Sequence, residues 1–150
     1  MNLAAQPEIM TSSSASAIFM KTSHFNIIFL YLSDDYDKQV IFNLLETWIQ
    51  TPIPTAVIGD INEDALGNSI FEKFMKSKDF YQMVDKPTRE SGKLSDHIYV
   101  NDQMDQIGFS TQVDANDYSD HDIISLYKEI VSEYFLNYCM RGNLIETCHR

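Results

Sequence analysis

The chain reads TAVIGDIN over residues 55–62, an apolar and β-branched run that passes directly into a carboxylate and an amide. This run, which follows Pro52 and Pro54, predicts a buried strand. A similar run, FNIIFLYL, occupies residues 25–32. Between the two, apolar residues recur at helical spacing: Val40, Ile41, Leu44, Leu45, Trp48 and Ile49. Strand, helix and strand in this order predict a right-handed crossover with parallel strands.

Further elements extend this crossover into an α/β fold. Asp37 is placed to cap the crossover helix, and Gly67 with Asn68 opens a second, shorter helix. Runs of apolar and aromatic residues predict more strands at residues 80–84, 96–100, 107–113 and 123–127. No internal repeat accompanies these elements. The sequence therefore predicts one α/β domain over residues 25–127.

The two ends of the chain differ from this central part. Residues 1–24 are rich in serine and lack periodicity, which predicts a flexible lead-in. Residues 128–150 are expected to form a C-terminal helix and tail, with Gly142 as the cap of the helix. One face of that helix is apolar: Ile130, Val131, Tyr134, Phe135, Tyr138 and Cys139.

Length and composition exclude several classes of protein. With 150 residues, 44% apolar residues, 5 glycines and 4 prolines, the chain can build a core and is not a low-complexity sequence. Two cysteines do not make a disulfide scaffold. The longest apolar run is too short for a bilayer and no secretory signal is visible, so we expect no membrane partner and a cytoplasmic or nuclear location.

The net charge of −11 speaks at first against a nucleic-acid partner. However, the charges are segregated along the chain. Basic residues gather between positions 73 and 93, whereas residues 102–122 hold six aspartates and no basic residue. Two solvated faces would explain this pattern. A metal-dependent enzyme that acts on phosphate esters would also need a basic strip beside a carboxylate cluster.

The end of the predicted strand at residues 55–58 carries the first candidate site. Asp60 and Asn62 are two residues apart, so they are expected to project together at the carboxyl end of a strand, where functional groups gather in parallel sheets. An aspartate can orient or deprotonate a water, and an amide can donate to a developing oxyanion. The alternative is a loop in which both residues only make turn hydrogen bonds.

Two further motifs lie at strand starts. Asp120 and His121, within the sequence SDHD, offer a metal-binding oxygen and a titratable imidazole just before a predicted strand. Asp96 begins another strand, where its carboxylate could hold a histidine in its charged, phosphate-binding form. Each motif alone has a purely structural alternative. Adjacent Ser119, Asp120 and His121 do not form a nucleophilic triad, because their side chains point in different directions.

Taken together in this order, the motifs resemble the carboxyl-terminal half of the endonuclease/exonuclease/phosphatase superfamily. The sequence GDIN at residues 59–62 is followed by FYQMVDKPTRESG at 80–92, DHIY at 96–99 and SDH at 119–121. The resemblance covers residues 25–127 and is strongest to the domains attached to retrotransposons and Helitron-type elements. It implies half of a four-layer α/β sandwich, a mixed sheet with flanking helices, from which the amino half of the fold is missing.

The resemblance also implies a mechanism. Asp60 would activate the attacking water, Asn62 would hold the water and the transition state, and Asp120 would bind a divalent metal, Mg²⁺ or Mn²⁺. His121 would bind the scissile phosphate and Asp96 would keep it charged. The substrate would be a nucleic acid, DNA rather than RNA, and the basic strip offers Lys86, Arg89 and Lys93 as phosphate contacts.

One departure from the superfamily leaves other functions open. The Glu that serves there as the principal metal ligand has no counterpart in this chain, because Glu46 falls within the crossover helix. The first alternative is therefore an inactive remnant or interaction module that self-associates through an exposed sheet face. The second alternative is a phosphatase that acts on a small phosphate ester.

Overall fold

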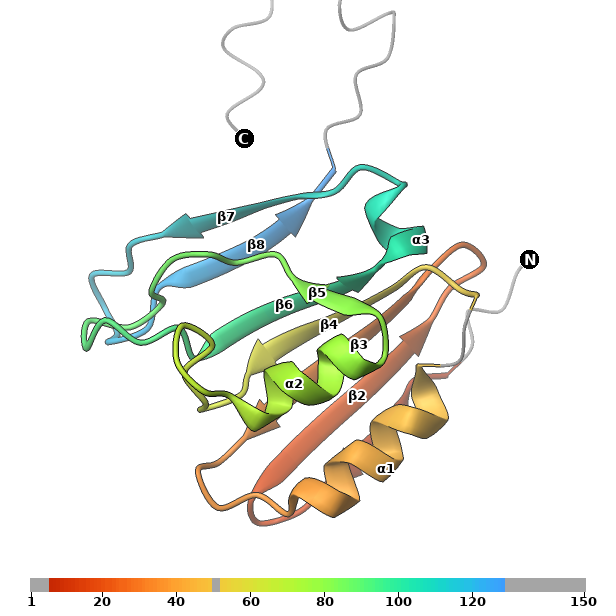
Figure 1. Cartoon of the computed structure of the whole chain (residues 1–150), viewed down its shortest axis with the longest axis horizontal. Coiled ribbons are helices and arrows are strands. Elements are labelled where there is room, and N and C mark those ends of the chain that lie inside the picture. The colour runs from red at the N-terminus through yellow and green to blue at the C-terminus, as the bar shows by residue number, and fades with distance from the viewer. Residues whose placement is uncertain (1–5, 50–51, 129–150) are drawn as a thin grey trace, which may run out of the picture.

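A computed structural model describes residues 6–49 and 52–128 and contains one six-stranded sheet and one two-stranded sheet (Figure 1). The strands of the large sheet are β1 (Glu8–Thr11), β2 (Ala15–Lys21), β3 (Asn26–Leu32), β4 (Thr55–Asp60), β5 (Phe80–Gln82) and β6 (Asp96–Asn101). Their spatial order is β1-β2-β3-β4-β6-β5. Only β3 and β4 pair in parallel; the other neighbours are antiparallel, so the sheet is mixed as expected.

The predicted crossover is confirmed. Strands β3 and β4 run in parallel, with Asn26 opposite Thr55 and Tyr31 opposite Asp60, and α1 (Lys38–Trp48) connects them. The helix begins after Asp37, whose carboxylate accepts a hydrogen bond from the amide of Val40. Strand β4 continues two residues beyond the predicted apolar run and therefore carries Asp60 at its last position.

Helices α1 and α2 (Ile70–Ser77) cover one face of the large sheet (Figure 1). Ser69 caps α2 by accepting from the amide of Glu72. The core between helices and sheet includes Ile28, Leu32, Ile41, Leu45, Phe71, Met75 and Tyr99. Full burial of an aliphatic or aromatic side chain contributes about 1.5–3 kcal/mol, so this layer holds the sheet and the crossover together.

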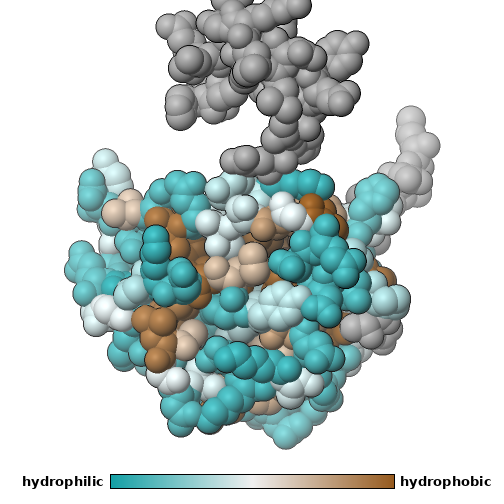
Figure 2. All heavy atoms as spheres, turned by 45° about the horizontal axis from the view of Figure 1, so that its top comes forward, coloured by the Kyte–Doolittle hydropathy of each residue, from teal (hydrophilic) through white to brown (hydrophobic). Residues whose placement is uncertain are grey.

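The opposite face of the large sheet is covered in part by the small sheet, which pairs β7 (Ser110–Asp114) with β8 (Ile123–Tyr127). Ile98 of β6 packs under Val113, Ile124 and Leu126. From the β7–β8 side, the surface is a mosaic of hydrophilic side chains and short hydrophobic patches (Figure 2). The protein thus has mixed α/β architecture, with helices on one face of the large sheet and a second sheet over part of the other.

The predicted strand at residues 107–113 starts later than expected. Asn101 accepts a hydrogen bond from the amide of Met104 and caps a short helix, α3 (Asp102–Asp105). A turn with Gly108 at a φ of 80° follows, so pairing begins only at Ser110. The turn that follows the short helix therefore takes up residues 107–109, which apolar content alone assigns to the strand.

The expectation of a flexible lead-in over residues 1–24 is wrong for the part of it that the structure describes. Strands β1 and β2 occupy residues 8–11 and 15–21, and β2 pairs with β3 along its whole length. Along β2, the buried residues Ala15, Ala17 and Phe19 alternate with more exposed ones. Small side chains and serines conceal this period of two, and β3 supplies the pairing edge. The predicted helix within 128–150 falls outside the described residues after Lys128.

Among the described residues, no helix is both long enough and apolar enough to cross a membrane.

Candidate active site

Three strand ends bring the predicted site residues together. Asp60 ends β4 and lies opposite Asp96, the first residue of β6, while His121 lies just before β8. One oxygen or nitrogen from each of these three side chains lies within 4.8 Å of the others. Asp60 and Asp96 are 36 positions apart in the sequence, and Asp96 and His121 are 25 apart. The pairing of β4 with β6 makes the first two neighbours, and a hydrogen bond joins Asp96 to His121.

His121 is held between two carboxylates. Its Nδ1 donates to Asp96, at 3.1 Å from Oδ1 and 3.0 Å from Oδ2. Its Nε2 lies 3.9 Å from Oδ2 of Asp60. Because Asp96 fixes one ring nitrogen, the other is directed toward Asp60 and the open part of the site. The side chains remain 24% (His121), 19% (Asp60) and 13% (Asp96) exposed, so a ligand can reach them.

A fully buried hydroxyl fixes the carboxylate of Asp96 in turn. Thr88 Oγ1 donates to Asp96 Oδ2 at 2.7 Å and accepts from the amides of Ser95 at 3.1 Å and Asp96 at 3.0 Å. The carbonyl of Thr88 also accepts from the amide of Asp122, at 2.8 Å. Thr88 therefore ties the turn at residues 88–93 to both the start of β6 and the loop that carries His121.

Arg89 reaches the site from the same turn. Its guanidinium Nη2 contacts Nε2 of His121, and a single β-bridge joins the backbones of these two residues. The turn is closed by hydrogen bonds from the amide of Arg89 to the carbonyl of Lys93 and from the amide of Gly92 to the carbonyl of Arg89. Gly92 has a φ of 80°, a conformation that glycine adopts without strain. The Nε of Arg89 is buried and has no hydrogen-bond partner among the described residues.

The remaining predicted residues lie around this cluster in different roles. Asn62 adopts a φ of 55°, donates its backbone amide to Asp60 Oδ1 at 3.1 Å and donates its side-chain amide to the carbonyl of Leu32 at 2.7 Å. It thus shapes the turn after β4. Asp120 is exposed, and its carbonyl accepts from the amide of Glu90. Its carboxylate is outside the three-residue cluster.

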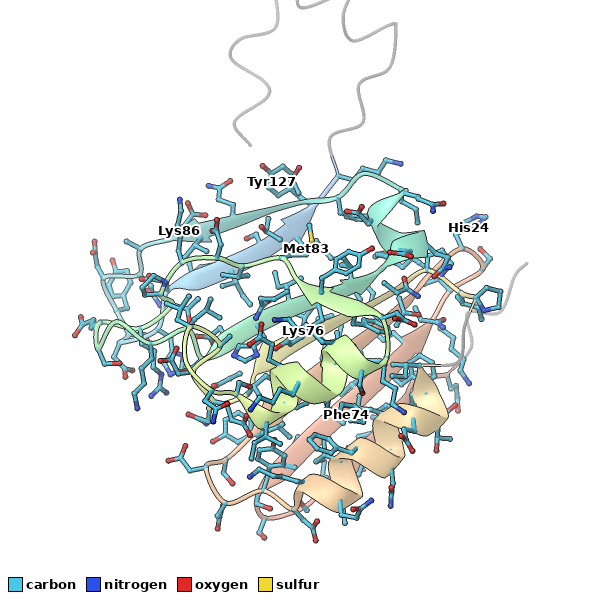
Figure 3. All side chains as sticks on the ribbon, in the orientation of Figure 1. His24, Phe74, Lys76, Met83, Lys86 and Tyr127 are labelled. Atoms are coloured by element: carbon cyan, nitrogen blue, oxygen red, sulfur yellow. The ribbon has the colours of Figure 1, made fainter. Side chains whose placement is uncertain are left out.

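The predicted basic strip is divided by the fold. Lys86 and Lys93 are exposed and lie on the segment that carries Arg89. Lys76 lies on α2, where it pairs with Glu72 at 2.7 Å, and Lys78 pairs with Glu46 at 2.6 Å. Figure 3 shows Lys76 over the helical layer and Lys86 well away from it, near β7 and β8. Only the second half of the strip therefore accompanies the site.

The pKa of Asp60 is shifted by burial and by a neighbouring negative charge. Partial burial raises the pKa of this carboxyl group, and the nearby charge of Asp96 raises it further. The amide of Asn62, His121 and Arg89 oppose the shift without cancelling it. The site therefore holds a carboxylate whose negative charge is incompletely compensated, which is a setting that favours a cation.

His97, next to Asp96 in the chain, has a structural role. Its side chain is fully buried, and its Nε2 lies 2.9 Å from the carbonyl of Glu63 and 3.0 Å from that of Leu94. Burial lowers the pKa of this imidazole. Its Nδ1 lies 3.0 Å from the hydroxyl of Tyr99. His97 thereby fastens the loop after β4 to β6 and leaves the candidate chemistry to His121.

The donor set fits a hard divalent cation that keeps several of its own waters. Asp60 Oδ2 makes no hydrogen bond within the described residues, so it is free to act as a ligand, whereas Asp96 is engaged by Thr88 and His121. Mg²⁺ is commonly bound by one or two carboxylates together with water and substrate phosphate. Asp60 is therefore the carboxylate of this cluster that is free to hold such an ion.

Thr88 is the residue that sequence analysis missed. The segment KPTR at residues 86–89 contributes to the family resemblance and offers Lys86 and Arg89 as phosphate contacts, but the sequence predicts no role for Thr88. The sequence offers one signal for the role of Thr88. This threonine lies between Pro87 and Arg89, eight positions before Asp96, the first residue of a predicted strand. It becomes informative only once the turn at residues 88–93 is known to fold back onto β6.

Comparisons by sequence find no relatives: no protein-family profile matches the chain, and no curated protein matches it. Comparison of the fold gives clear matches. The cytolethal distending toxin of Haemophilus ducreyi aligns with a TM-score of 0.61 at 15% identity, over 85% of this chain and 60% of that one. The endonuclease domain of TRAS1, a telomere-specific non-LTR retrotransposon, gives 0.57 at 13% identity, over 80% and 66%.

An endonuclease/exonuclease/phosphatase family protein from Leptotrichia buccalis matches as well, with a TM-score of 0.58 at 16% identity, over 85% of this chain and 62% of that one. The chain therefore shares its fold with these three structures, and the predicted α/β class, a mixed sheet with flanking helices, is confirmed. The chain spans less than two thirds of the length of each of these three structures.

Proposed function

We propose that this chain is a metal-dependent phosphodiesterase that acts on nucleic acid, an endonuclease of mobile-element origin. The observation that carries this proposal is the convergence of Arg89 and His121 beside the carboxylate of Asp60. Arg89 brings to this point a buried Nε–H without a hydrogen-bond acceptor among the described residues. An unmet guanidinium donor beside an imidazole suits a phosphate group, whose oxygens accept hydrogen bonds from arginine.

Each residue of the site has a different role in the proposed cleavage of a phosphodiester. Asp60 orients the attacking water and accepts its proton, a task that suits a carboxylate whose pKa is raised by burial and by Asp96. His121 and Arg89 donate to the phosphate oxygens and stabilise the charge that develops on them. Asp96 and Thr88 keep the imidazole of His121 in position.

A bound divalent cation would supply Lewis-acid stabilisation of the phosphate charge. Asp60 and Asp120 are the carboxylates that would hold it, and Mg²⁺ or Mn²⁺ suits their oxygen ligands. Asn62 contributes through its backbone amide, which donates to Asp60 and fixes the carboxylate.

Three observations support a polymeric nucleic-acid substrate, which we take to be DNA in preference to RNA. Lys86 and Lys93 are exposed on the segment that presents Arg89, so they are available to contact further phosphates of a polymeric substrate. One of the matched structures is itself described as the endonuclease domain of a retrotransposon. The segment PTR followed by DHIY, quoted above for its resemblance to mobile-element domains, agrees with this choice.

Nicking of supercoiled plasmid DNA in the presence of Mg²⁺ or Mn²⁺ tests the proposal. We expect cleavage by the wild type that is lost in Asp60→Asn and abolished by EDTA. Asp34→Asn, which makes the same chemical change at an exposed turn, is the control and should cleave like the wild type. Absence of cleavage by the wild type with either metal would contradict the proposal. Faster hydrolysis of a soluble inositol phosphate than of DNA would replace the nuclease with the phosphatase alternative.

A further inference from the structure

One row of apolar side chains crosses the large sheet on the face opposite the helices. Register pairs Ile9 with Ile18, Ile18 with Phe29, Phe29 with Ile58, and Ile58 with Ile98, so five neighbouring strands each contribute one member. Exposure changes along the row: Ile98 is fully buried, whereas Phe29 is 39%, Ile18 38% and Ile9 65% exposed. The row is therefore covered at its β6 end and open at its β1 end.

The cover is the β7–β8 pair, which packs Val113, Ile124 and Leu126 against Ile58 and Ile98. Beyond Ile58 no described residue continues this layer over β1, β2 and β3. We call the uncovered part the open sheet face; it consists of Ile9, Ile18, Met20, Phe29 and Tyr31. A sheet with apolar side chains on both faces needs a second layer on each, so this face is built to be covered.

We propose that residues 129–142 form an amphipathic helix that packs on the open sheet face as a continuation of the β7–β8 layer. The described chain ends beside this face. Strand β8 is part of the covering layer, and Tyr127 pairs with Ser110 at the end of the small sheet. Phe109, next to Ser110, packs edge-on against Phe25, the residue before β3, with ring centroids 6.3 Å apart. The segment after Lys128 thus begins at one end of the open sheet face.

Residues 129–142 also match the open sheet face in length and in apolar character. The segment carries six apolar residues on one helical face, Ile130, Val131, Tyr134, Phe135, Tyr138 and Cys139. Glu129 and Glu133 fall on the opposite face. A helix of fourteen residues is about 21 Å long, and a strand of seven residues such as β3 spans about 23 Å. One such helix can therefore run the length of β2 and β3 and bury their outward side chains.

The inference does not depend on nuclease activity, and cross-linking of the full chain tests it. Cys148→Ser leaves Cys139 as the only cysteine, and Ile18→Cys then places a partner on the open sheet face. We expect a short bismaleimide to join the two cysteines within one monomer. The matched control is Asn43→Cys, exposed on α1 on the other side of the sheet, which should not be joined to Cys139.

Every other outcome of the cross-linking experiment counts against the proposal. Products that link two chains, together with a dimeric mass in light scattering, would assign the face to a second copy. Equal yields at positions 18 and 43 would mean that the segment has no fixed place. Absence of any product would mean that the segment lies elsewhere.

A double-mutant cycle gives an independent readout. Phe29→Asp and Phe135→Asp should each lower the melting temperature, and the double variant should melt close to the single variants because both changes break the same contact. Tyr118→Asp, at a side chain that is 99% exposed, should combine additively with Phe135→Asp. Full additivity of the Phe29 and Phe135 changes would overturn the proposal.

Discussion

His121 and Asp96 form a hydrogen-bonded pair in which Nδ1 lies 3.0 Å from Oδ2 and 3.1 Å from Oδ1. The partners are 25 positions apart in sequence and come from the loop before β8 and the start of β6. Because the carboxylate takes up one ring nitrogen, the other is the one that faces Asp60 and Arg89. The orientation of the candidate catalytic imidazole is therefore set by β6, a strand in the other sheet.

Asp96→Asn tests this pairing. The amide has the shape of the carboxylate but carries no charge and can present an N–H to the imidazole, so His121 loses the partner that fixes its orientation. We expect plasmid-nicking activity to fall by about a hundredfold or more. Asp114→Asn, at an exposed position on β7, should leave activity unchanged. An Asp96→Asn protein as active as wild type would remove Asp96 from the site.

Thr88 offers a pair of substitutions that separate shape from hydrogen bonding. Thr88→Val keeps the volume but removes the hydroxyl, which leaves a carboxylate oxygen of Asp96 and two buried amides without this partner. The expected cost is about 1–3 kcal/mol in the free energy of unfolding, accompanied by a loss of activity. Thr88→Ser retains the hydroxyl and should recover most of the activity. Both are measured by urea denaturation and by nicking rates; equal activity of the two variants would show that the hydroxyl does not matter.

Asp60→Asn should lose activity and gain stability. Folding raises the pKa of Asp60, so at neutral pH the native state holds a charge that it disfavours, and the isosteric amide removes that cost. The melting temperature of the variant should exceed that of wild type at pH 7. This advantage should shrink as the pH falls through the pKa of Asp60, because the wild-type group then becomes neutral too. A lower melting temperature for Asp60→Asn at pH 7 would contradict this electrostatic argument.

Bound Mg²⁺ should offset the destabilising charge of Asp60 and so stabilise the folded wild-type protein. An ion that binds the folded protein stabilises it by about 1.4 kcal/mol when its concentration is ten times its Kd. We therefore expect Mg²⁺ to raise the melting temperature of wild type and to leave Asp60→Asn nearly unaffected, as measured by calorimetry with EDTA-treated protein as reference. An equal rise in both proteins would place the ion elsewhere.

Gly59→Ala tests the position of Asp60 through the backbone. A Cβ at this position would overlap the carbonyl oxygen of Leu30, and the neighbouring carbonyl carbon and amide nitrogen of Leu30 would lie only 2.7 and 2.9 Å away. Backbone cannot move aside cheaply, so we expect a loss of about 3 kcal/mol in unfolding free energy. Gly67→Ala, whose Cβ would meet its nearest neighbours at 3.5 Å, is the matched control. Equal stability of both variants would contradict the close approach of β3 and β4.

Much of the large sheet could be predicted from the sequence. The strand–helix–strand unit follows from local periodicity, and its parallel pairing follows from the handedness and length of the connection. Asp60 could be placed at a strand end for the same reason. Strands β1 and β2 escaped prediction because Ala15 and Ala17 are small and the neighbouring serines mask the alternation, so only pairing with β3 defines them.

The sequence by itself determined most of the candidate site residues and the crossover that holds Asp60 at the end of β4. Their geometry was decided by the tertiary structure, because β6 inserts between β4 and β5 and brings Asp96 opposite Asp60. The turn at residues 88–93 then adds Thr88 and Arg89 around His121. Long-range pairing leaves no local pattern: a hydrogen bond between distant residues depends on which strands become neighbours, and that follows from burial of the whole sheet.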